Sequence, residues 1–145
     1  IYLRHIILVS HGTMAPALEG AMAMIIGKQK NVSSTSMEDG MGANVYVDHF
    51  RELIEDFSSQ DQILLLGDLA QGSPMTNAVK VLSERGLMGN TIAFAGMNLP
   101  MVITAAMLNE NEDTESIKRE ILGESKRQIK VLDFSDDEDE KDEDI

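Results

Sequence analysis

The sequence predicts a doubly wound α/β fold, in which a mainly parallel sheet carries helices on both faces. Three short apolar runs, over residues 5–9, 62–66 and 91–95, have the length of strands. Unbroken apolar runs of this length are typical of parallel strands, because a parallel sheet is covered on both faces. Helical patterns separate the three runs, and a helical crossover is the usual connection between parallel strands.

The first half of the chain contains two predicted strands and two predicted helices. The strand over residues 5–9 is followed by a helix over 16–27, with proline in its first turn and glycine at its end, as these residues prefer. A weaker, polar strand over 31–37 is expected at the sheet edge, and the glycines of 38–42 indicate a loop. Residues 43–57 predict an amphipathic helix, because apolar side chains recur there at helical spacing. These side chains are Val47, Phe50, Leu53, Ile54 and Phe57.

The second half continues the same alternation. A loop over 69–72 follows the second apolar strand, and Ser73 and Pro74 are expected to open a helix that ends near Glu84. Serine is a good N-cap, and proline fits the first helical position. A further helix over 99–109 follows the third apolar strand. The three apolar strands and the polar edge strand therefore make up one sheet.

The C-terminal part is predicted to divide into the end of the domain and a tail. A polar hinge over 109–113 leads to a polar helix over 114–126, and residues 128–134 are expected to form a short last strand. Residues 135–145 contain eight acidic residues, one lysine and one large apolar residue. Such a segment repels itself and buries almost no apolar area. We therefore expect one domain over residues 1–134 and a disordered acidic tail over 135–145.

The composition argues against several classes of protein. The chain has no cysteine, which excludes disulfides and thiolate metal sites. Its formal net charge of −13 gives no electrostatic reason to bind nucleic acid. No apolar run approaches the roughly 20 residues of a membrane span, and no signal peptide is visible. We expect a cytoplasmic protein.

Polar residues follow all three apolar strands. They are Ser10, His11, Gly12 and Thr13 after the first, Gly67 and Asp68 after the second, and Gly96, Met97 and Asn98 after the third. In open α/β sheets the ligand lies outside the carboxyl ends of the strands. The three clusters should therefore meet on one rim.

His11 and Asp68 are the informative pair on this rim. A carboxylate from the neighbouring strand end can accept a hydrogen bond from one ring nitrogen and leave the other as a nucleophile. The alternative interpretation is two polar residues in solvated loops. The helix start at Ser73 adds free N–H groups and a positive dipole end, which suit a phosphate. Ser73 is an N-cap, a phosphate ligand or both, and Gly72 permits a close backbone approach or serves the turn.

Two other histidines need no function. His5 lies at the far end of the first strand, and His49 lies on the amphipathic helix. A three-histidine metal site would need them to converge with His11, so no metal site is predicted.

The segments ILVSHGTMA (residues 7–15) and LLLGDLAQGSP (residues 64–74) resemble the IIA domains of the mannose family of the sugar phosphotransferase system. Three further segments fit in order and spacing: GKQKNV (27–32), EDGMG (38–42) and GMNLPM (96–101). The resemblance covers roughly residues 6–110.

This resemblance implies a phosphoryl carrier in sugar uptake. Such domains accept phosphate from the phosphohistidine of HPr and pass it to a histidine of the IIB component, which serves a membrane permease. His11 would be the phosphoacceptor and Asp68 would orient its ring. Ser73, Gly72, Gly12 and Thr13 form the predicted phosphate-binding set. The family also implies a homodimer, with a C-terminal strand that can be exchanged between subunits. No cofactor is expected, since the chain has no P-loop pattern for ATP.

Three alternatives stay open. The phosphotransferase subunit of a dihydroxyacetone kinase shares this fold, but its partner is a nucleotide-bearing subunit. A small α/β metal chelatase also has a His-Gly at a strand end, and it needs further ligands on the same rim. A non-catalytic binding module is the third. A histidine phosphatase is disfavoured, because its motif has arginine where this chain has Ser10.

Overall fold

The computed structural model describes residues 3–135, which form one four-stranded parallel sheet with the strand order β2-β1-β3-β4. Its strands are β1 (Arg4–His11), β2 (Val32–Met37), β3 (Gln62–Gly67) and β4 (Thr91–Phe94). From β1 the chain moves to the edge strand β2, and it then crosses back over β1 to form β3 on the opposite side of β1. The order therefore reverses at β1, whose carboxyl end is where a doubly wound fold binds its ligand. The predicted fold class is confirmed.

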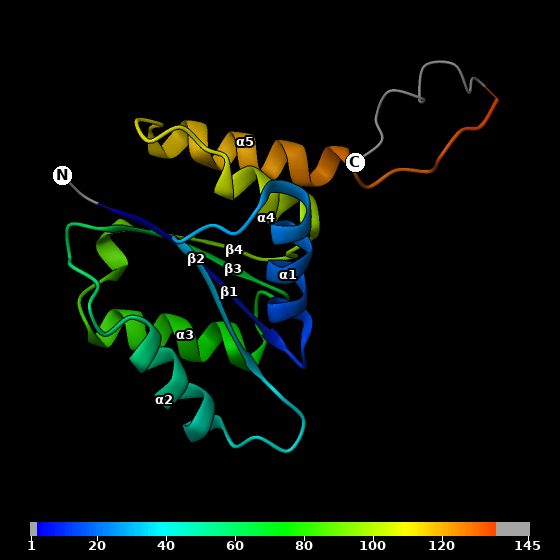
Figure 1. Ribbon diagram of the computed structural model, residues 1–145. Coiled ribbons are helices and arrows are strands. Elements are labelled where there is room, and N and C mark those ends of the chain that lie inside the picture. Colours follow the sequence, from blue (N-terminus) through cyan, green and yellow to red (C-terminus); the bar gives the residue numbers. More distant parts are fainter. Residues whose placement is uncertain (1–2, 136–145) are drawn as a thin grey trace.

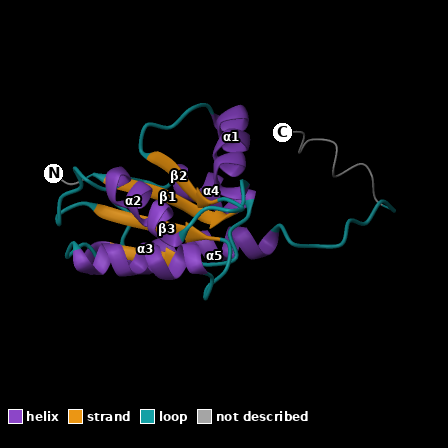
Figure 2. Ribbon diagram, turned by 90° about the horizontal axis from the view of Figure 1, so that it is seen from below, coloured by secondary structure: helices purple, strands orange, loops and turns teal. Residues whose placement is uncertain are grey.

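Helices cover both faces of the sheet, as Figure 1 shows. The helices α1 and α4 pack on one face with α5 against α4, while α2 and α3 cover the other face, which is nearer the viewer in Figure 2. Their bounds are α1 (Met14–Ile26), α2 (Ala43–Leu53), α3 (Ser73–Glu84), α4 (Leu99–Ala106) and α5 (Thr114–Arg127), with a short 3-10 helix, η1 (Met88–Asn90), before β4.

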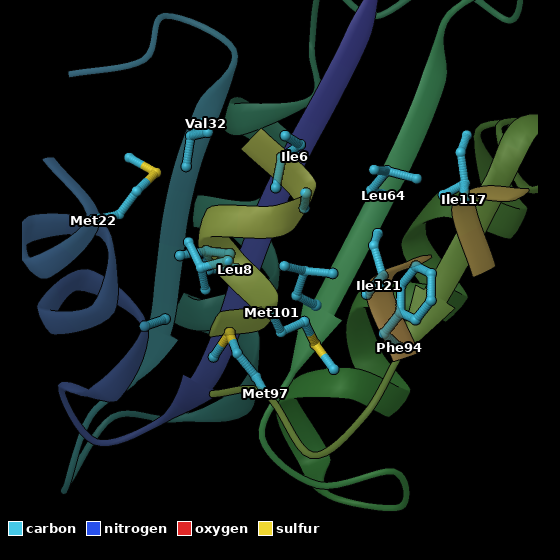
Figure 3. Packing of buried hydrophobic residues seen from close by; sticks show 14 residues of the cluster. Ile6, Leu8, Met22, Val32, Leu64, Phe94, Met97, Met101, Ile117 and Ile121 are labelled. Atoms are coloured by element: carbon cyan, nitrogen blue, oxygen red, sulfur yellow. The ribbon is translucent and has the colours of Figure 1, made fainter. Parts of the chain in front are cut away.

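The two apolar layers share the central strands. Alternate residues of β1 point to opposite faces, so Ile6 and Leu8 pack beneath α4 and α5, while Ile7 and Val9 pack against α2 and α3. All four are fully buried. Figure 3 shows the first layer, where side chains of β1, α4 and α5 meet. The prediction that the apolar runs are strands buried on both faces is confirmed.

The predicted last strand is absent. The described chain leaves α5 at Arg127, and residues 128–134 pair with no strand of residues 3–135. This segment runs away from the sheet (Figure 1), and its apolar side chains are exposed: Ile129, Val131, Leu132 and Phe134. A strand needs a neighbour for its N–H and C=O groups, and none of the described strands lies beside this segment.

Other differences are small. The helix predicted over 16–27 begins two residues earlier, and those predicted over 43–57 and 99–109 end sooner. The predicted acidic tail lies outside the described residues except for Ser135, which is exposed. No helix within residues 3–135 is both long and apolar enough to cross a membrane.

Candidate functional site

The carboxyl edge of the sheet brings the polar strand ends together. His11 is the last residue of β1, and Asp68 directly follows β3. The loop after β4 is tied to the same place, because the N–H of Met97 donates to the carbonyl of Gly67 at 3.0 Å and that of Gly96 to the carbonyl of Asp68 at 3.2 Å. The three polar segments that the sequence places on one rim therefore lie side by side.

His11 and Asp68 are joined by two hydrogen bonds to one oxygen. The Oδ2 atom of Asp68 lies 2.8 Å from Nδ1 of the ring and also accepts the backbone N–H of His11 at 2.9 Å. Its Oδ1 atom accepts the N–H of Leu69 at 2.8 Å. An ionised carboxylate only accepts hydrogen bonds, so Nδ1 carries the ring proton. The other nitrogen, Nε2, keeps its lone pair on a side chain that is 47 % exposed.

The Asp68 carboxylate is held in its ionised form. Burial raises its pKa, but the hydrogen bonds from the His11 backbone and ring and from Leu69 outweigh burial, and the pKa lies below its usual range. The carboxylate is therefore negative at neutral pH. A carboxylate in this position restrains the ring orientation and can stabilise positive charge on the imidazole.

The beginning of α3 lies against the free edge of the ring. A Cβ atom at Gly72 would be 2.7 Å from Cε1 of His11 and 3.5 Å from Nε2. Only glycine leaves room for this approach without a shift. Gly72 is the N-cap of α3, and no side chain caps the helix. The first-turn N–H groups and the positive end of the helix dipole therefore lie near Nε2.

Ser73 does not occupy its predicted N-cap position. It is the first residue of α3, and its exposed hydroxyl accepts a hydrogen bond from Nδ2 of Asn77 at 3.1 Å. The N-cap lies one residue earlier than the sequence predicts, because Gly72 has the extended backbone of an N-cap. The hydroxyl is thus left on the surface, one residue after the glycine that meets the ring.

Gly12 and Thr13 form the turn between β1 and α1. Gly12 has a φ of +60°, which favours glycine, and its N–H donates to the Met37 carbonyl at 2.9 Å. Thr13 is the N-cap of α1 but makes no capping hydrogen bond through its side chain. The buried hydroxyl of Ser10 instead accepts the N–H of Ala15 at 2.7 Å. Both Gly12 and Thr13 are exposed next to His11.

Sequence reasoning misses one further residue near the site, Tyr46 of α2. Its hydroxyl donates to the carbonyl of Pro74 in the first turn of α3 at 2.7 Å. The side chain is fully buried. Burial, and then the charge of Asp68, raise its pKa above the usual value for tyrosine. The available signal was its place four residues before Phe50 on the buried side of an amphipathic helix.

The other two histidines lie elsewhere, as expected. His5 pairs with Asp61 through Nε2 at 2.9 Å and stacks on Phe57, at the opposite edge of the sheet from His11. His49 is exposed on α2. Within the described part of the chain, no group of three histidine, cysteine, aspartate or glutamate side chains is placed to hold a metal ion.

The chain matches one family model, described as the PTS system fructose IIA component, over residues 5–122. Among curated proteins it is similar to the PTS system fructose-specific EIIA component of Bacillus subtilis strain 168. The two are 23 % identical over 126 residues, which cover 87 % of this chain and 84 % of the relative.

Solved structures share the fold. The phosphotransferase system component EIIA of Streptococcus agalactiae has a TM-score of 0.75 at 24 % identity, covering 92 % of this chain and 98 % of that chain. The mannose/sorbose-specific IIA subunit of Enterococcus faecalis has a TM-score of 0.76 at 23 % identity, covering 90 % and 96 %. The comparisons favour neither a dihydroxyacetone kinase subunit nor a metal chelatase.

Proposed function

Because this chain belongs to the family of PTS fructose IIA components, which are phosphoryl carriers in sugar uptake, we propose that His11 is the residue that carries the phosphoryl group. The observation that supports this role most is the 2.8 Å contact between Nδ1 and Asp68, which leaves Nε2 free at the start of α3. Incubation with enzyme I, HPr and phosphoenolpyruvate, followed by location of the phosphoryl group, tests the proposal.

In this transfer, the Nε2 lone pair of His11 attacks the phosphorus of phosphohistidine on HPr. The new N–P bond forms as the donor's N–P bond breaks, and the donor imidazole leaves with the electron pair. Asp68 stabilises the positive charge that develops on the His11 ring through the Nδ1 proton. In the second transfer, a histidine of the IIB component attacks the phosphorus, and the imidazole of His11 leaves with the electron pair of the breaking N–P bond.

The phosphoryl oxygens are received by backbone groups. Gly72 and Ser73 place the first-turn N–H groups of α3 beside Nε2, and the Ser73 hydroxyl is a further ligand. Gly12 and Thr13 directly follow His11 in the chain and lead into the exposed start of α1. The helix start at Gly72 beside the reactive nitrogen suits a group that carries about two negative charges.

The domain over residues 1–134 performs this cycle with protein partners. HPr donates and the IIB component accepts, so the membrane permease is served indirectly, and the reaction takes place in the cytoplasm. The exposed ring of His11 suits such direct contact between proteins, because both partner histidines must reach Nε2.

Replacing Gly72 by alanine is expected to slow phosphorylation by roughly 10- to 100-fold, because displacement of a reacting group by about 1 Å can cost this much. The added methyl would meet Cε1 of His11 at 2.7 Å, and the Asp68 hydrogen bond restrains the ring from moving away. Initial rates with limiting protein and excess phospho-HPr measure the effect. Gly20→Ala is the matched control, since a Cβ there meets nothing within 4 Å. A normal rate for Gly72→Ala would contradict the close approach.

A homodimer is the second expectation. The edge strand β4 has no outer neighbour among the described strands, and an open groove runs along it to the beginning of α5. The exposed apolar segment after α5 includes Ile129, Val131 and Phe134, which are 75 %, 95 % and 69 % exposed. Exchange of this segment between two copies would pair the edge and cover these side chains.

Sedimentation at micromolar concentration should therefore give twice the 15.9 kDa mass of one chain. Val131→Asp should shift the protein toward the monomer, because it places a charge in the exchanged segment. Met24→Asp changes an equally exposed apolar residue on α1 and should leave the dimer intact. A monomeric wild-type protein would rule out the exchange.

A further inference from the structure

The first turn of α3 has few connections of its own. Gly72 provides no side-chain cap, and Pro74 has no N–H to donate. On the sheet side, Met75 packs so closely on β3 that a Cβ at Gly67 would lie 2.4 Å from its methyl group. Within the helix, Asn77 donates to the carbonyl of Ser73 at 2.9 Å. On the side of α2, the hydroxyl of Tyr46 donates to the carbonyl of Pro74. The turn is therefore held between β3 and α2.

The Tyr46 hydroxyl is a permanent donor. It is fully buried, and burial together with the charge of Asp68 keeps the phenol neutral by raising its pKa. The ring belongs to the same apolar layer as Phe50 and Ile54. A rigid, buried ring with one polar atom thus points at one peptide group of the turn.

That peptide group also contains the N–H of Met75. Its carbonyl belongs to Pro74 and its N–H to the next residue, so a hydrogen bond to the oxygen polarises the whole unit. Polarisation along such a chain strengthens the donor at its other end. Met75 N–H is one of the first-turn groups that the helix itself leaves unpaired. The contact both fixes this donor and makes it stronger.

We propose that Tyr46 is a positioning residue for phosphoryl transfer, which holds and polarises the first turn of α3 beside Nε2 of His11. The inference rests on the proposed role of His11 as phosphoacceptor. Tyr46 touches no partner protein, because its side chain is fully buried. Its loss should consequently act on the transfer step and not on recognition of HPr.

Tyr46→Phe keeps the ring and removes only the hydroxyl. The maximal transfer rate at saturating phospho-HPr should fall roughly 3- to 30-fold, while KM for phospho-HPr stays within about twofold, as expected for an interaction made with the transition state. The 31P resonance of the phosphohistidine should shift, because the donor at Met75 has changed. Site-specific 3-fluorotyrosine at position 46 retains the hydroxyl and should restore the rate.

Ile54→Val is the matched control. Ile54 is fully buried in the same layer of the core, so its truncation loosens α2 without touching the turn. Its maximal rate and 31P resonance should be normal. An equal loss of rate in Ile54→Val, a normal rate in Tyr46→Phe, or a Tyr46→Phe protein without a cooperative thermal transition would each overturn the inference. If His11→Ala were still phosphorylated, the proposed function would fail instead.

Discussion

Replacing His11 by alanine is expected to abolish phosphorylation by HPr. Alanine removes Nε2, the proposed nucleophile, and no other histidine lies on the same rim in the described part of the chain. Labelled phosphoenolpyruvate with enzyme I and HPr should give the wild-type protein an acid-labile, base-stable label and leave His11→Ala unlabelled. Thermal unfolding should change little, because the side chain is 47 % exposed.

His49→Ala is the control for this experiment. It removes an exposed imidazole from α2 and should take up label at the wild-type rate. Label on His11→Ala at the normal level would show that another residue is the carrier.

Asp68→Asn has the second largest expected effect, a fall in transfer rate of roughly 10²- to 10⁴-fold. In a serine protease, the same change of an aspartate that orients a catalytic histidine costs about 10⁴-fold, because the ring adopts the wrong tautomer. Here the amide can present its NH₂ group to Nδ1, which moves the ring proton to Nε2 and blocks the lone pair. In the wild-type protein, Oδ2 of Asp68 lies 2.8 Å from Nδ1 and so determines which ring nitrogen carries the proton.

Asp61→Asn supplies a matched control. Asp61 also pairs with a histidine, but it contacts Nε2 of His5, at the amino-terminal end of β1. The hydrogen bond from His5 is the largest of the effects that lower its pKa. Its ionised form therefore stabilises the fold at neutral pH, and this stabilisation is lost as the pH falls through the lowered pKa. Asp61→Asn should lower the unfolding temperature at pH 7 but keep the transfer rate. Comparable rates for Asp68→Asn and wild type would refute the orienting role.

The sequence predicts the sheet well because each central strand is recognisable from its own unbroken apolar run. Residues such as Ile7 and Leu65 lie in runs that can only be buried on both faces, and the helices between them impose parallel pairing. The proximity of His11 and Asp68 follows from the same reasoning, since neighbouring parallel strands end at one edge.

What the sequence does not predict depends on contacts across the fold. Ser73 has the better capping side chain, but the N-cap is Gly72, since only glycine fits against the His11 ring. Tyr46 has the helical spacing of an ordinary core residue. Its proposed positioning role can be inferred only from the structure, which shows that its hydroxyl donates to the carbonyl of Pro74 in α3. The segment over 128–134 has the composition of a strand, yet strand formation depends on a neighbour, and residues 3–135 of one chain provide none.

The most direct test is to locate the phosphoryl group in the wild-type protein. After phosphorylation by enzyme I, HPr and phosphoenolpyruvate, 31P NMR of the intact protein identifies the modified ring nitrogen, and peptide mapping under basic conditions identifies the residue. We expect one phosphoryl group per chain, on Nε2 of His11, since Nδ1 is occupied by Asp68. A phosphoryl group on Nδ1, or on any other residue, would contradict this expectation.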